Sequence, residues 1–118
     1  MQRQNIRWLV SAAMLSLFAL PLTAPQAPAD EAKLETESYL IPSADPGISL
    51  YIRNKHPAGV TSFAPDRILL YVHGATYPAE TSFDLPLGGR SMMDYVAQHG
   101  YDVYLVDVRG YGGSTKPP

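Results

Sequence analysis

Two short and almost uninterrupted apolar segments constrain the fold of this chain more than any other feature. Residues 67–74, RILLYVHG, and residues 101–108, YDVYLVDV, are rich in β-branched and aromatic residues. Runs of this kind are typical of strands that are buried on both faces of a parallel sheet. Parallel strands need a crossover between them, and a helical pattern lies in between. We therefore expect a βαβ unit with a right-handed crossover over residues 67–108.

The crossover helix is expected in residues 91–100, SMMDYVAQHG. Ser91 and Asp94 stand three apart as a capping pair, and an apolar stripe follows them. Gly100 suits the left-handed position just after a helix. The preceding segment, residues 75–90, is predicted to be a long loop.

An antiparallel hairpin is expected before this unit, because residues 35–43 and 47–55 look like strands and ADPG between them is a strong turn signal. Together these elements predict an α/β fold with a mostly parallel sheet. One helix covers only one face of such a sheet, so we expect further strands and helices after Pro118. Without them, we expect residues 101–108 to expose an unpaired edge and this segment alone to be poorly folded and inactive.

The first 29 residues have the pattern of a secretory signal peptide. MQRQNIR carries two arginines, and WLVSAAMLSLFALPL is uncharged and mostly apolar. The apolar run is about fifteen residues, shorter than the ~20 that a membrane-spanning helix needs. Ala27 and Ala29 occupy the small-residue positions of a cleavage site. We expect cleavage after Ala29 and a periplasmic or extracellular protein that does not stay in the membrane; an uncleaved N-terminal anchor is the alternative.

Composition excludes several classes of function. The chain has no cysteine, so it has no disulfide framework, no cysteine metal site and no lipoprotein anchor. Its net charge is −2 and its lysines and arginines are scattered, which leaves no basic stripe for the phosphates of a nucleic acid.

Ser114 is a tempting nucleophile because it follows a strand and two glycines. A nucleophile elbow needs G-x-S-x-G, but Lys116 occupies the place of the second glycine and two prolines follow. Ser91 lacks the motif as well. Ser114 is therefore predicted to be a loop residue. Residues 110–115 also begin like a dinucleotide-binding G-x-G-x-x-G, but they end in threonine, so a dinucleotide-binding domain is a weaker hypothesis.

Two motifs together carry a resemblance to a known family. YVHGATYP is similar to the His-Gly oxyanion loop of the α/β-hydrolase fold superfamily, and YDVYLVDVRGYGGS resembles its D-x-R-G-x-G-x-S loop. The resemblance covers residues 37–116. It implies that residues 30–118 are the N-terminal segment of an α/β-hydrolase domain, truncated before the nucleophile elbow.

The resemblance also implies roles for particular residues. The backbone N–H of Ala75 corresponds to a donor of the oxyanion hole, and Thr76 is the alternative because Pro78 stands later than in many members. The nucleophile, the acid and the base are expected to lie outside this chain. Structural roles in the loops are implied for His73, Gly74, Asp107, Arg109, Gly110, Gly112 and Ser114. His73 is not expected to be the catalytic base, since the family's triad histidine comes last in the chain. Asp107 and Arg109 are expected to brace the turn after residues 101–108 through charge-assisted hydrogen bonds.

The function implied is that of an exported hydrolase. It would act on an ester, amide or related bond of a small-molecule substrate, and no metal or organic cofactor is implied. The alternative is a secreted, non-catalytic binding protein with the same fold. A downstream G-x-[Ser/Asp/Cys]-x-G between a strand and a helix, followed by an acid and a late histidine, would distinguish the two.

Overall fold

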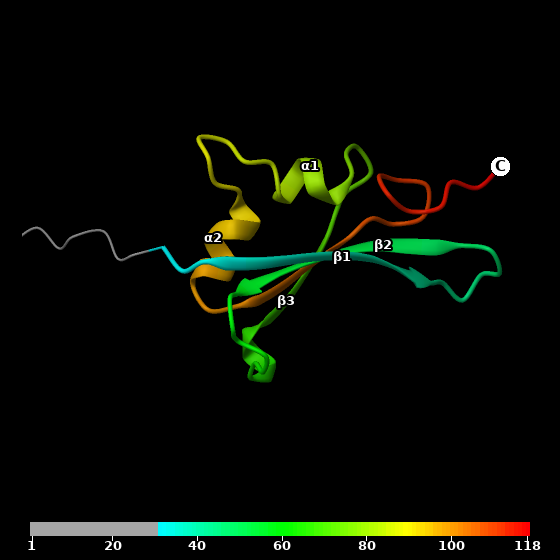
Figure 1. Cartoon of the computed structure of the whole chain (residues 1–118). Coiled ribbons are helices and arrows are strands. Elements are labelled where there is room, and N and C mark those ends of the chain that lie inside the picture. The colour runs from blue at the N-terminus through cyan, green and yellow to red at the C-terminus, as the bar shows by residue number, and fades with distance from the viewer. Residues whose placement is uncertain (1–30) are drawn as a thin grey trace, which may run out of the picture.

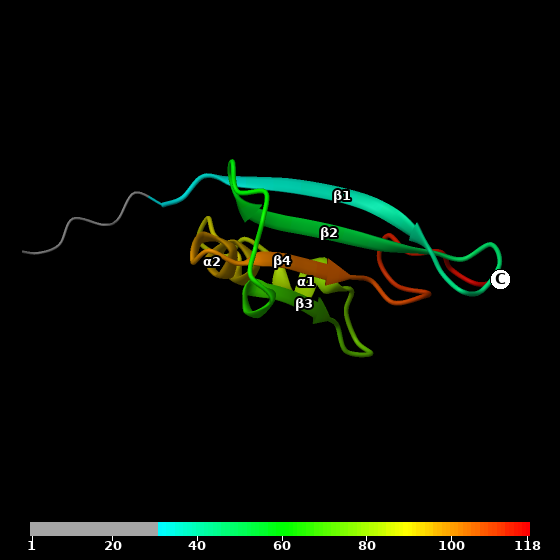
Figure 2. The ribbon, with the colours of Figure 1, turned by 90° about the horizontal axis from the view of Figure 1, so that it is seen from below.

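The computed structural model describes residues 31–118, which form a four-stranded sheet with two α-helices on one side (Figure 1). The predicted signal peptide lies outside the described residues. The strands are β1 (Leu34–Pro42), β2 (Ser49–Pro57), β3 (Ile68–Val72) and β4 (Asp102–Val106). The helices are the 3-10 turn η1 (Pro65–Arg67), α1 (Ala79–Phe83) and α2 (Met92–Gln98). The strand order is β1-β2-β4-β3 (Figure 2).

The hairpin is confirmed. β1 pairs with β2 in antiparallel register from Leu34 opposite Pro57 to Pro42 opposite Ser49. Gly47 closes the turn with a φ of 77°, in the left-handed region that favours glycine.

The βαβ unit is confirmed as well. β3 and β4 pair in parallel from Ile68 opposite Asp102 to Val72 opposite Val106, and α2 lies between them in the chain. The helix begins with the predicted capping box: the Ser91 hydroxyl accepts from the Asp94 N–H, and the Asp94 carboxylate accepts from the Ser91 N–H, both at 2.9 Å.

The prediction of a mostly parallel sheet is wrong for the described residues, because two of the three strand pairs are antiparallel. β4 lies between β2 and β3, and it runs against β2 from Ile52 opposite Val106 to Lys55 opposite Val103. The edge strands are therefore β1 and β3, and β4 is not at an edge, as predicted, but inside the sheet. The apolar Val103 and Leu105 explain this order, since the central position buries both side chains completely.

The segment predicted to be a long loop contains the short helix α1. Pro78 precedes it in an extended conformation with φ of −64°, which suits the residue before a helix. The first N–H of the helix, from Ala79, donates to the carboxylate of Asp107 at 2.7 Å. A contact from a distant strand end thus supplies a cap that the local sequence does not contain.

The core lies between the helices and one face of the sheet. It consists of Ala79, Met93, Ala97, Val103 and Leu105, all fully buried. On the other face, the β3 side chains Ile68, Leu70 and Val72 are exposed. The prediction that β3 is buried on both faces is thus not met by the described residues, because α1 and α2 lie on the same side (Figure 1). Within residues 31–118, no helix has the length and apolar character needed to cross a membrane.

A partly buried ion-pair network, centred on the buried Asp84, connects both helices to β2. The Asp84 carboxylate, just after α1, accepts from Arg53 at 2.8 Å, from Lys55 at 2.6 Å and from the Ser91 hydroxyl at 2.7 Å. Lys55 also donates to Asp94 on α2 at 2.6 Å. Burial by itself raises the pKa of Asp94, but hydrogen bonds from Lys55 and Ser91 outweigh it, so that the pKa lies below its ordinary value.

This lowered pKa predicts a loss of stability in acid. The contribution of Asp94 is complete above the pKa of the unfolded chain, about 4, and is lost as the pH falls through the lower pKa of the folded state. We expect the free energy of unfolding of the full-length protein to fall less steeply below about pH 4 in Asp94→Asn than in the parent. Urea unfolding at a series of pH values measures this, with the exposed Asp66→Asn as control. Equal slopes in Asp94→Asn and the parent would contradict the assignment.

Candidate functional site

The candidate site lies where the parallel strands β3 and β4 end. Two loops meet there: the β3 loop, residues 73–78, and the β4 loop, residues 107–115. Ligand sites of α/β sheets form outside the carboxyl ends of parallel strands, because the loops that leave neighbouring strands meet at that edge. The structure thus brings together all the loop residues for which the sequence implied a role.

His73 joins the two loops. Its side chain is buried, and its Nδ1 lies 2.6 Å from the Gly74 carbonyl oxygen, while its Nε2 lies 3.0 Å from the Val108 N–H. Nε2 must accept from Val108, so the proton of the neutral ring is on Nδ1, where it donates to Gly74. Both ring nitrogens are occupied, and His73 is not free to act as a base.

A second contact between the loops comes from Tyr111. Its hydroxyl donates to the Ala75 carbonyl oxygen at 2.6 Å. Its ring packs against that of His73, with centroids 4.7 Å apart and an angle of 58° between the planes. The carbonyls of Gly74 and Ala75 are therefore both bound within the protein.

The amide groups of the β3 loop behave differently from its carbonyls. None of the described residues accepts a hydrogen bond from the N–H of Ala75 or Thr76, and both residues are exposed. A Cβ built on Gly74 would meet no atom within 4 Å, so the space beside the loop is open. The N–H groups of Gly74 and Tyr77 also have no acceptor among the described residues, so the β3 loop presents a run of unpartnered backbone donors that includes both candidates.

Asp107 braces both loops from inside. Its buried carboxylate accepts from the Ala79 N–H at 2.7 Å and from the Gly113 N–H at 2.9 Å. Its own N–H donates to the Tyr51 carbonyl on β2 at 3.0 Å. Gly112 has a φ of 45°, and a Cβ there would lie 1.9 Å from the Asp107 carboxylate, so only glycine fits.

Arg109 has a different partner from the one expected. The sequence suggested that it braces the turn together with Asp107, but its guanidinium pairs with Asp45 in the β1–β2 turn at 2.8 Å. Both side chains are largely exposed, so this pair contributes little stability. Gly110 has a φ of 91°, and its N–H donates to the Thr115 carbonyl at 3.0 Å within the β4 loop.

Ser114 is a buried loop residue. Its hydroxyl accepts from the Tyr51 N–H at 2.8 Å and donates to the Asp107 carbonyl oxygen at 2.5 Å. The hydroxyl proton is thereby committed to the backbone. Among residues 31–118, no histidine ring is hydrogen-bonded to a serine hydroxyl or to a carboxylate. The described residues therefore offer donors for an oxyanion but no paired nucleophile and base.

The sequence argument did not single out Tyr111. The residue stands at a variable place of the D-x-R-G-x-G-x-S pattern, and its partner Ala75 is 36 positions away. Neither Tyr77 nor Tyr104 makes a hydrogen bond between the two loops. Tyr77 is exposed at the end of the β3 loop, and the Tyr104 hydroxyl donates to Asp102 at 2.9 Å. Burial and this hydrogen bond raise the pKa of Tyr104 to about 12.

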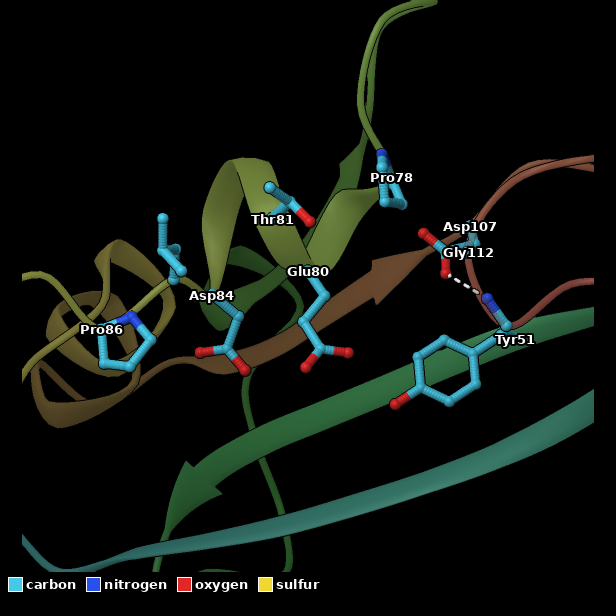
Figure 3. Close-up of a pocket in the computed structure, with 10 residues that line it drawn as sticks. Tyr51, Pro78, Glu80, Thr81, Asp84, Pro86, Asp107 and Gly112 are labelled. Carbon is cyan, nitrogen blue, oxygen red and sulfur yellow. Dashed lines mark hydrogen bonds between the residues drawn. The ribbon is translucent and has the colours of Figure 1, made fainter.

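A cavity of about 380 Å³ lies between α1, β2 and the β4 loop. In Figure 3, Glu80 and Asp84 extend from the α1 segment toward β2, which carries Tyr51. Asp107 lines the cavity, but residues 73–76 do not. The cavity therefore adjoins Asp107 and not the N–H groups of Ala75 and Thr76. The most buried carboxylates that line it, those of Asp84 and Asp107, already accept hydrogen bonds from protein donors.

Comparison with known proteins points to one kind of fold. No protein-family model matches the sequence, and no curated protein matches it. One similar solved structure is that of a novel bacterial esterase, with a TM-score of 0.53 and 22% sequence identity, over 79% of this chain and 34% of the esterase. At this identity the likeness shows the fold alone. The chain spans about a third of the length of the esterase.

Proposed function

We propose that residues 30–118 are the N-terminal segment of an exported hydrolase with the α/β-hydrolase fold. The enzyme acts on an ester, amide or related bond of a small-molecule substrate. Its nucleophile, acid and base lie beyond residue 118, and the β3 loop supplies a backbone N–H, from Ala75 or from Thr76, to the oxyanion hole. The fold likeness to an esterase supports this proposal.

The observation that carries the proposal is the contrast between carbonyls and amides in the β3 loop. The carbonyls of Gly74 and Ala75 are bound by His73 and Tyr111, whereas the N–H groups of Ala75 and Thr76 have no acceptor among the described residues. Negative charge builds up on the substrate oxygen as a nucleophile attacks. Donors that are already oriented stabilise this charge without reorganising, and each contributes about 2.7–4 kcal/mol.

The test is hydrolysis and covalent labelling by the full-length protein. We expect it to hydrolyse p-nitrophenyl acetate and to react with a fluorophosphonate probe at a serine beyond residue 118, located by mass spectrometry of peptides. Hydrolysis without labelling would assign an aspartate or cysteine nucleophile instead. Absence of both hydrolysis and labelling would favour the non-catalytic binding protein, and an adduct on Ser114 would contradict the assignment of that residue.

Replacing Ser114 tests its structural role directly. We expect Ser114→Ala to keep kcat within a few-fold, while the free energy of unfolding falls by about 1–3 kcal/mol because the Tyr51 N–H loses its acceptor. Ester hydrolysis and urea unfolding of the full-length protein measure the two effects. The exposed Ser62→Ala is the control. Complete loss of kcat in a folded Ser114→Ala variant would show that this hydroxyl takes part in the reaction.

Export is tested by the N-terminus of the mature protein. The two arginines, the apolar run and the Ala-x-Ala site favour cleavage after Ala29. N-terminal sequencing of the exported protein should therefore begin at Asp30. An uncleaved chain that stays in the membrane fraction would show that residues 1–29 are an N-terminal anchor.

A further inference from the structure

The Tyr111 hydroxyl acts on an amide that it does not touch. It donates to the Ala75 carbonyl at 2.6 Å, and this carbonyl shares a planar peptide unit with the N–H of Thr76. In a trans peptide the two groups point in opposite directions, and the described residues contain no cis bond. The hydroxyl therefore determines the direction of the Thr76 N–H.

His73 does the same for the preceding peptide. Its Nδ1–H donates to the Gly74 carbonyl at 2.6 Å, which sets the direction of the Ala75 N–H. The two rings pack against each other, and His73 is held to the β4 loop by the Val108 N–H. Two successive peptides of the β3 loop are thus oriented by one ring pair.

Tyr111 is itself held firmly. Its N–H donates to the Val108 carbonyl at 3.0 Å, and its own carbonyl accepts from the Ser114 N–H at 2.9 Å. The flanking Gly110 and Gly112 both have positive φ, so the chain turns on either side of Tyr111. Because the turns fix the backbone of this residue, its hydroxyl reaches the β3 loop with less loss of conformational entropy than a mobile side chain would suffer.

We propose that Tyr111 is a positioning residue that aims the Thr76 amide at the substrate oxygen through the Ala75 carbonyl. This inference rests on the proposed function of the β3 loop. The hydroxyl makes no contact with substrate. Its effect is greatest in the transition state, where the charge on the substrate oxygen is largest, and it therefore changes kcat and not KM.

The kinetic test is Tyr111→Phe in the full-length protein. Phenylalanine keeps the ring that packs on His73 and removes only the hydroxyl. We expect kcat for p-nitrophenyl acetate to fall about 10-fold, less than the loss of a whole donor, with KM within about two-fold of the parent. Tyr39→Phe is the matched control, because this half-exposed tyrosine lies on β1, outside both loops, and its hydroxyl has no hydrogen-bond partner among residues 31–118. An unchanged kcat in Tyr111→Phe, or a change in KM alone, would overturn the proposal.

A second measurement does not depend on catalysis. In ¹⁵N relaxation spectra of the same variant, we expect the Thr76 amide order parameter to fall from about 0.85 toward about 0.6, with the amides of α2 unchanged. An unchanged Thr76 amide would overturn the inference even if activity falls. If the parent protein hydrolyses no ester while the Thr76 amide responds, the proposed function fails and the orienting role of Tyr111 stands.

Discussion

Asp107→Ala is expected to destabilise the full-length protein by about 3–5 kcal/mol. The substitution leaves the N–H groups of Ala79 and Gly113 without an acceptor. Hydrogen bonds to a buried carboxylate contribute about 1.5–3 kcal/mol each, and an unpaired buried N–H adds its own desolvation cost. Urea unfolding followed by circular dichroism measures the loss.

Three further variants separate the bracing role of Asp107 from a general effect of charge. Asp107→Asn keeps one acceptor oxygen and should lose less stability than Asp107→Ala. Asp45→Ala removes an exposed carboxylate that pairs with Arg109 and should cost less than about 1 kcal/mol. Gly112→Ala should resemble Asp107→Ala, because its Cβ would displace the same carboxylate. A stability of Asp107→Ala within about 1 kcal/mol of the parent would show that Asp107 does not brace the loops.

The second large effect is expected from proline in the β3 loop. Proline has no N–H, so the variant that removes the true oxyanion donor, Ala75→Pro or Thr76→Pro, should lower kcat by roughly 10²–10³. The other proline variant should lower kcat less. Comparison of kcat between Ala75→Pro and Thr76→Pro therefore identifies which residue donates to the oxyanion. The proline ring requires a negative φ, and neither Ala75 nor Thr76 has a positive φ, so the sign of φ does not exclude proline at either position.

Matched variants that keep the N–H complete this experiment. Ala75→Gly and Thr76→Ala change the side chain alone and should leave kcat of the full-length protein within a few-fold. Circular dichroism verifies that each proline variant is folded before its kcat is compared. If both folded proline variants retain the parent kcat, the oxyanion site lies outside the β3 loop.

Much of the local structure was predictable because it depends on residues close together in the chain. The turn at Gly47 needs only a Pro-Gly pair, and the start of α2 needs only Ser91 and Asp94, three positions apart. The parallel pairing of β3 with β4 also followed from local patterns, since two apolar runs around an amphipathic helix have few other arrangements. The short helix α1 escaped prediction because its cap comes from Asp107, 28 positions later.

By itself the sequence determined the hairpin, the βαβ unit, and the absence of a nucleophile elbow at Ser114, all of which depend on short-range patterns. Only the tertiary structure decided the strand order, which places β4 inside and β3 at an edge. It alone also showed that the carbonyl of Ala75 is bound by Tyr111 while the neighbouring amides have no acceptor among the described residues. The physical reason is distance along the chain: a hydrogen bond between residues 36 positions apart leaves no periodic trace in either segment, and it exists only once the strands that carry them have paired.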